Sequence, residues 1–193
     1  MLATQYFKKR SYTFRGFTRD VIRLLRKSSR IRDSMKSGRI STQFRERIML
    51  AVTAVNGCVY CEWAHTKVAL EQGCTNEEIK EIMVHDFGSC NPYEVVGLAF
   101  AQRYAETEGL PPEEAYQKLF SHYGEEKAND IILFIKIITI GNLLGNTFDA
   151  FESRLRGLPP EKGSFFFEFY IYILGFPFFK GFKRKSKKKI EEQ

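Results

Sequence analysis

Two cysteines and a histidine lie close together in the segment CVYCEWAH at positions 58–65. If this segment is helical, Cys58, Cys61 and His65 stand at i, i+3 and i+7, so the two sulfurs and the imidazole share one face. Cys58 follows Asn56-Gly57, a helix stop signal, and is therefore expected near the N-terminus of a new helix. Unpaired N–H groups and the helix dipole favour a thiolate there, and a nearby histidine can take or relay its proton. The pattern indicates a redox-active thiol pair.

A carboxylate residue precedes the cysteines at a spacing that could bring it close to the thiols or to His65. Glu46 lies twelve residues before Cys58. One straight helix would hold the two residues roughly 18 Å apart, at about 1.5 Å per residue, which is too far for proton exchange. A break at Asn56-Gly57 would instead fold the first helix back against the second. Glu46 would then lie near the thiols or near His65, where a carboxylate can pass protons at neutral pH.

The combined spacing Glu46-x11-Cys58-x2-Cys61-x3-His65 resembles the active-site signature of the AhpD-like alkylhydroperoxidases, within the carboxymuconolactone decarboxylase superfamily. The residues that follow are also similar to that family's usual continuation, at Ala69, Gly73, Thr75 and Glu77-Glu78-Ile79. The resemblance covers about residues 40–156. It implies an all-α, AhpD-like helical bundle and, because the decarboxylase members lack the cysteine pair, redox chemistry.

This resemblance implies a peroxidase-like or disulfide-reductase cycle that needs no cofactor. In the family the second cysteine, here Cys61, forms the sulfenic acid, and the first, here Cys58, supplies a proton and then closes the Cys58–Cys61 disulfide. Glu46 and His65 would relay protons through water. A lipoyl protein, a thioredoxin-like protein or a small thiol would reopen the bridge. Helix-terminus physics instead favours Cys58 as the thiol of lower pKa, so the order of attack stays open.

Two other interpretations give these residues no redox role. A structural zinc site would use Cys58, Cys61, His65 and either Cys74 or Glu46, although such sites favour a second ligand pair downstream, which this sequence lacks. Alternatively the cysteines are inert core residues, because free cysteine is often buried. In either case the protein would be a non-catalytic helical binding or scaffolding module, and membrane attachment or stabilisation by zinc would be compatible with that role.

Several further residues are candidates for structural roles. Cys74 and Cys90 are expected to be packed thiols, since a vicinal pair needs no third cysteine. Three polar residues in a very apolar segment either line the site or make helix–helix hydrogen bonds: Asn142, Asn146 and Asp149.

The elements that would position this site are all helical. Apolar residues recur at helical spacing over 42–56, 58–72, 93–106 and 112–123, and a long apolar helix is expected from 125 toward 155. Thr75 and Glu78 form a capping-box pattern before another helix. A basic amphipathic helix is expected from Thr18 to Lys27. No strand–helix alternation is visible, which favours an all-α bundle.

Charge and composition divide the chain into three parts: a basic N-terminal extension (1–38), the AhpD-like domain (39–158) and an aromatic, polybasic tail (159–193). Residues 1–35 carry ten Lys and Arg against two Asp, and residues 163–193 carry seven against three Glu. The residues between them carry thirteen Lys and Arg against eighteen Asp and Glu. An acidic body with basic ends suits contact with an anionic surface better than reading of nucleic acid.

The start of the chain has no run of about 7 to 15 apolar residues before a small-residue cleavage site, which predicts a cytoplasmic protein without a secretory signal. Residues 165–179 are apolar but shorter than the roughly 20 residues of a spanning helix. The tail over 164–189 would therefore either attach to the inner face of a membrane or pack on a sister subunit of a homo-oligomer.

Overall fold

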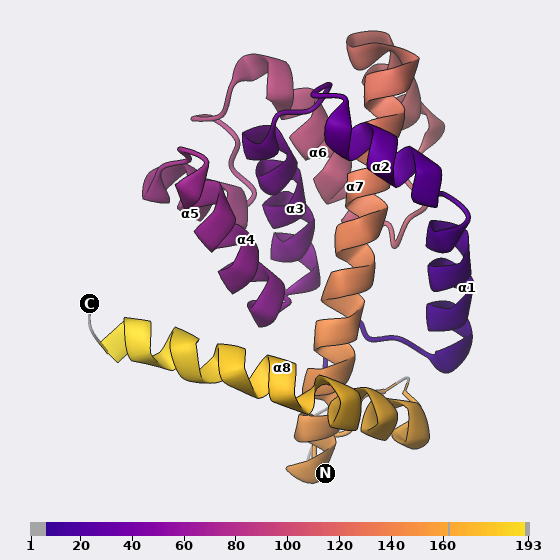
Figure 1. The fold of residues 1–193 in the computed structure, drawn as a ribbon, viewed down its shortest axis with the longest axis vertical. Helices are drawn as coiled ribbons and strands as arrows, with labels where there is room; N and C mark the ends of the chain where they lie inside the picture. The colour runs from indigo at the N-terminus through magenta and orange to yellow at the C-terminus, as the bar shows by residue number, and fades with distance from the viewer. Residues whose placement is uncertain (1–6, 162, 192–193) are drawn as a thin grey trace, which may run out of the picture.

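A computed structural model describes residues 7–161 and 163–191, and the side chains among them apart from those of 180 and 182–191. The described residues contain no strand, and their helices form the all-α bundle that the sequence predicts (Figure 1). The helices are α1 (Phe14–Leu25), α2 (Ser28–Lys36), α3 (Thr42–Asn56), α4 (Val59–Glu71), α5 (Asn76–Met83), α6 (Pro92–Glu106), α7 (Glu113–Leu155) and α8 (Phe165–Glu191).

Helix α7 is the central element. It runs along the length of the molecule with α3, α4 and α5 on one side and α1 on the other, and α2 crosses it (Figure 1). The main hydrophobic core lies where α3, α6 and α7 meet, and Phe44, Leu98 and Ile131 are buried there. The predicted helix over 125–155 is thus confirmed as a buried core helix. The segment 131–135, three of whose residues are β-branched isoleucines, is helical because burial on several faces outweighs its strand propensity.

The length and composition of α7 would also allow it to cross a membrane, but 61% of its apolar window is buried inside the protein. A kink at Gly124, where φ is 73°, separates an N-terminal portion from the apolar one. This left-handed conformation suits a residue without a Cβ. The kink at Gly124 allows the N-terminal portion of α7, 113–123, to fold back beside the apolar portion.

The predicted break between the first two core helices lies at Gly57. Helix α3 ends at Asn56, and Gly57 adopts the left-handed conformation (φ 67°) with its N–H donating to Thr53 O at 2.8 Å. Cys58 is extended, and α4 begins at Val59. The two helices therefore pack against each other. The capping box predicted for the next helix is also present, between Thr75 and Glu78.

The N-terminal helix begins earlier than predicted. Thr13, not Thr18, caps α1, and its hydroxyl accepts a hydrogen bond from Gly16 N at 3.2 Å. Thr18 lies inside the helix and donates to Phe14 O. The helix extends to Phe14 because this ring and that of Phe17 contact Phe167 of α8. The early start is a tertiary effect that the local pattern does not contain.

Helix α2 was not expected, because its sequence is mostly polar. An ionic cluster at α7 holds it. Asp130 is fully buried and accepts hydrogen bonds from Arg30 (3.1 Å) and from Arg39 just beyond the helix (2.6 Å). Buried carboxylates require such pairing.

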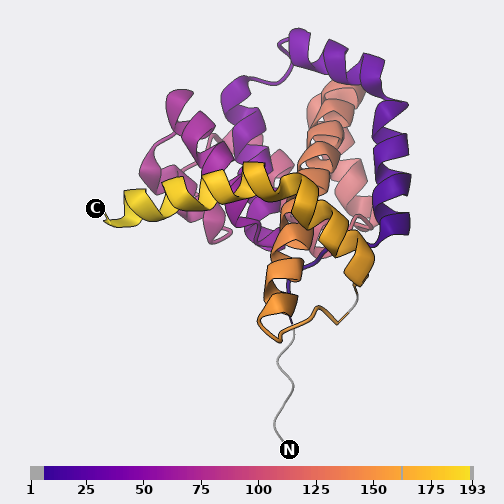
Figure 2. The ribbon, with the colours of Figure 1, turned by 60° about the horizontal axis from the view of Figure 1, so that its bottom comes forward.

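The C-terminal tail forms α8, which lies across α7 and continues past it (Figure 2). The ring of Tyr172 stacks on Phe148 of α7 at 4.8 Å, and Phe167 and Ile171 are buried. Glu168 is fully buried and accepts two hydrogen bonds from Arg154, at 2.9 and 3.1 Å. The side chains of the lysine-rich stretch from 182 onward lie outside the described part of the chain, so the polybasic part of the tail stays a prediction, as do the three domain boundaries.

Candidate active site

The two cysteines stand at the start of α4. Cys58 is its N-cap residue, and Cys61 lies in its first turn. Their Sγ atoms are 3.0 Å apart and unbonded, so the pair is a dithiol. The backbone N–H of Cys61 also donates to Cys58 Sγ, at 3.4 Å. Cys58 is fully buried, whereas Cys61 is partly exposed.

These contacts move the two thiol pKa values in opposite directions. The Cys61 S–H donates to the Cys58 sulfur, and this hydrogen bond, with the backbone N–H groups of Tyr60 and Cys61, lowers the pKa of Cys58 although burial opposes it. The same hydrogen bond, followed by burial and the charge on Cys58, raises the pKa of Cys61. Of the two thiols, Cys58 is therefore the one that ionises first, and Cys61 is the one that keeps its proton.

Helix α7 approaches the sulfurs through two glycines. A Cβ at position 145 would lie 2.6 Å from Cys58 Sγ, and one at position 141 would lie 3.7 Å from Cys61 Sγ. The first distance is shorter than any real carbon contact, so only glycine at 145 lets α7 pack so closely. Neither glycine was among the site residues predicted from the sequence. Their signal is the spacing of Gly141 and Gly145 by one helical turn in an otherwise apolar helix.

Polar residues of α7 fix its position against α3. Asn142 accepts a hydrogen bond from Asn56 Nδ2 (3.1 Å) and donates one to Thr53 Oγ1 (3.0 Å). Asn146 donates to the carbonyl of Asn56 at 2.8 Å. Asn142 also hydrogen-bonds the Cys61 sulfur, which lowers the pKa of that thiol and so opposes part of the rise. Asn142 therefore both lines the site and makes helix–helix hydrogen bonds, which were the two alternatives raised by the sequence. Asn146 makes hydrogen bonds between elements.

The third polar residue of that segment, Asp149, accepts a hydrogen bond from Tyr60 Oη at 2.6 Å and lies 3.5 Å from Lys9 Nζ. Tyr60 occupies one of the two positions between the cysteines. Its hydrogen bond to Asp149 anchors the first turn of α4 to α7.

Glu46 lies beside His65. The fold-back at Gly57 brings Glu46 Oε2 to 2.6 Å from His65 Nδ1, and the carboxylate is almost fully buried. Its other oxygen accepts from Arg45 Nε at 3.2 Å. His65 follows Cys61 by one turn of α4, a spacing that brings side chains together on a helix surface. The carboxylate fixes Nδ1, which leaves Nε2 to exchange protons.

The remaining cysteines lie elsewhere. Cys74 and Cys90 are both buried, and their environment includes Arg47 and Glu78. Burial raises the pKa of Cys74 and raises that of Cys90 to about 11. Within the described residues, no group of three or more His, Cys, Asp and Glu side chains is arranged to hold a metal ion.

The fold and the site together define a class of protein: an all-α bundle with a vicinal dithiol at a helix N-terminus and a Glu–His pair one turn away. The model of the carboxymuconolactone decarboxylase family matches residues 25–102. The chain is 30% identical to an uncharacterized protein, YdfG, of Bacillus subtilis (strain 168), in an alignment that covers 55% of this chain and 74% of that protein. No solved structure matched the chain. The chain belongs to the carboxymuconolactone decarboxylase family.

The opposed thiol pKa values predict how the protein titrates. Among the four cysteines, Cys58 alone has a lowered pKa, so the first ultraviolet thiolate absorbance to rise with pH should belong to it. Cys61→Ala removes the donor and should raise this first pKa toward that of an ordinary thiol. Cys61→Ser keeps a donor and should largely preserve the lowered value. Cys90→Ser is the control. An unchanged first pKa in Cys61→Ala would contradict the shared-proton arrangement.

Proposed function

We propose that the protein is a thiol-disulfide redox enzyme with peroxidase-like or disulfide-reductase activity, in which Cys58 and Cys61 alternate between dithiol and disulfide. The observation that carries the proposal is the 3.0 Å separation of the two sulfurs at a helix N-terminus. Disulfide closure needs only a further approach to about 2.05 Å, which side-chain rotation supplies. The pair formed by buried Glu46 and partly exposed His65, one helical turn after Cys61, supplies the proton chemistry.

Cys61 is partly exposed whereas Cys58 is fully buried, so we assign the attack on a substrate to Cys61. Its proton moves to the Cys58 thiolate as the Cys61 sulfur attacks the terminal oxygen of a hydroperoxide. The O–O bond breaks, Cys61 becomes a sulfenic acid, and the leaving alkoxide takes a proton from His65. His65, whose ring Glu46 holds, then takes up one proton from bulk solvent, and the later reduction by a dithiol, which restores the Cys58 thiolate, releases one proton in return.

The second step uses the proton now on Cys58. The Cys58 sulfur attacks Cys61 Sγ, the S–O bond breaks, and water leaves with that proton. A dithiol protein such as a lipoyl or thioredoxin-like protein, or two small thiols, then reduces the disulfide. A partner's disulfide could replace the hydroperoxide, with Cys61 forming the mixed disulfide and Cys58 resolving it. We expect the enzyme to act as a homo-oligomer.

Mild oxidation with an organic hydroperoxide tests the redox pair. The wild type should lose two thiols reversibly with dithiothreitol, and peptide mapping should find a Cys58–Cys61 disulfide. Cys58→Ser should stop at a sulfenic acid on Cys61, trapped by a sulfenic-acid reagent, whereas Cys61→Ser should form neither product. Cys74→Ser should behave as the wild type. If both thiols of the wild type stay free, the chain is better described as a binding or scaffolding module.

The Glu46–His65 contact predicts a kinetic role for the carboxylate. Glu46→Gln should keep the fold but slow turnover by on the order of 10²-fold and change the pH dependence of the rate, because a positioned acid–base group contributes about that much. Glu71→Gln, an exposed change at the end of α4, is the matched control. A folded Glu46→Gln protein with an unaltered pH–rate profile would reduce Glu46 to a structural role.

We also propose that α8 attaches the protein to the cytoplasmic face of an anionic membrane. Its outer face carries Phe166, Tyr170, Ile173 and Leu174, all more than half exposed and spaced by three or four residues. Large apolar side chains gathered on one face mark an interaction surface. The sequence continues into seven Lys and Arg from 180 to 189, each worth about 1 kcal/mol on an anionic surface.

Vesicle flotation tests the attachment. Full-length protein should float with anionic vesicles at low salt, because high salt screens the lysines. It should float only weakly with neutral vesicles, which do not attract the lysines. Replacement of Phe166, Ile173 and Leu174 together by serine should release most of it, because these side chains make no buried contact that the fold needs. Leu110→Ser removes an equally exposed side chain distant from α8 in the sequence and should have no effect. Wild-type protein that stays unbound would favour the subunit-packing alternative.

A further inference from the structure

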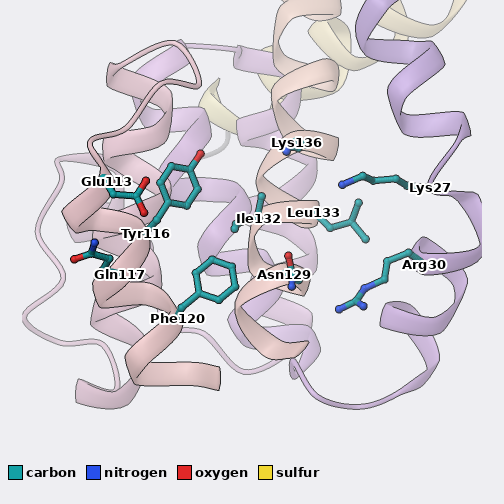
Figure 3. A pocket seen from close by; sticks show the side chains of 10 residues that line it. All are labelled: Lys27, Arg30, Glu113, Tyr116, Gln117, Phe120, Asn129, Ile132, Leu133 and Lys136. Carbon is teal, nitrogen blue, oxygen red and sulfur yellow. The ribbon is translucent and has the colours of Figure 1, made fainter. Parts of the chain in front are cut away.

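A groove separates the N-terminal helices from α7, on residues that the thiol chemistry does not use. A cavity of about 780 Å³ lies between Lys27 and Arg30 at the α1–α2 corner and Tyr116 and Phe120 of the N-terminal part of α7 (Figure 3). Leu133 lies between these two walls. A second hollow of about 600 Å³ shares Lys27, Tyr116, Leu133 and Lys136, and continues to Ile140. The two form one groove large enough for a small organic molecule.

Lys136 is the unusual residue of this groove. It is partly buried on α7, and no ion pair joins it to a carboxylate among the described residues. Burial, followed by the charges of Lys27 and Arg23, lowers its pKa, and Asp20 opposes this only weakly. Arg30, by contrast, is already paired with Asp130 and Glu126. The groove thus holds two ammonium groups, those of Lys27 and Lys136, that form no ion pair among the described residues, and Asp20, which lines the smaller hollow, is itself paired with Arg19.

The walls beside these two cations are apolar or aromatic. Leu133 is buried beneath the groove, and the rings of Tyr116 and Phe120 face it from the opposite side (Figure 3). Glu113 is the carboxylate of the larger cavity, and it stands on the wall opposite Lys27 and Arg30 (Figure 3). A partly desolvated ammonium gains most from a bound anion, and apolar walls gain from an apolar body. One molecule that carries both parts satisfies both surfaces.

We propose that this groove binds an amphiphilic carboxylate, with its head on Lys136 and Lys27 and its aliphatic body against Leu133 and Phe120. The site is separate from the dithiol: Lys136 precedes Gly141, which faces Cys61, by five residues, or about 7.5 Å along the helix. The proposal therefore goes beyond the thiol chemistry, and either can fail without the other.

Calorimetric titration of the full chain with decanoate, kept below its micelle-forming concentration, tests the site. Decanoate should bind, whereas decan-1-ol and decyltrimethylammonium of the same chain length should bind at least about tenfold more weakly, because a charge-assisted contact contributes that much. Lys136→Met keeps the apolar stem and should weaken decanoate binding by about tenfold or more. Lys118→Met, an exposed change on the same helix outside the groove, should leave the affinity unchanged.

Two further measurements distinguish binding in the groove from binding on α8 and from contact between subunits. The α8 variant with serine at 166, 173 and 174 should bind decanoate as the wild type does, so a loss there would place the ligand on α8 and overturn the proposal. Thermal unfolding and sedimentation should show Lys136→Met as stable and as large as the wild type. Equal decanoate affinity in Lys136→Met would also refute the proposal. A change only in the oligomeric state of this variant would refute it as well, because the groove would then be an interface between copies.

Discussion

The site depends first on the left-handed turn at Gly57. This one residue ends α3, leaves Cys58 extended at the head of α4, and reverses the chain so that the two helices pack together. Two consequences follow from the same turn. The sulfur of Cys58 receives hydrogen bonds from the first N–H groups of α4, and Glu46 comes within hydrogen-bond distance of His65. A longer or straighter connection would provide neither.

The turn at Gly57 alone would leave the two sulfurs open to water. Helix α7 packs over them and excludes water from Cys58. Its backbone comes so close that position 145 has no room for a methyl group. This approach buries Cys58, while the amides of Asn142 and Asn146 hold α7 in register with the end of α3. Apart from Asn146 Oδ1, these buried amide groups are hydrogen-bonded, and their hydrogen bonds favour one arrangement of the three helices. That rigidity keeps the Sγ–Sγ distance short without a covalent bond.

The sequence predicted those features that depend on neighbouring residues. The stop at Asn56-Gly57, the capping box at Thr75 and the apolar helix over 125–155 are local patterns, and the structure confirms them. The pairing of Glu46 with His65 rather than with the thiols was one of two options, since spacing fixes proximity but not partner. Helix α2 and the groove beside Lys136 depend on contacts across about a hundred residues, which no local pattern contains.

A single reactive thiol must both ionise readily and be accessible to its substrate. Here each of the two cysteines has one of these properties. Cys58 has the hydrogen bonds that stabilise a thiolate but is fully buried, whereas Cys61 is partly exposed but has a raised pKa. A thiolate that is both stable and buried is a poor nucleophile toward an outside substrate, and it is a good base for a neighbour 3.0 Å away. Helix-terminus physics and exposure therefore do not conflict. In the proposed cycle, the first property assigns Cys58 as the base and the second assigns Cys61 as the attacking sulfur, and transfer of the proton from Cys61 to Cys58 begins the sequence of steps.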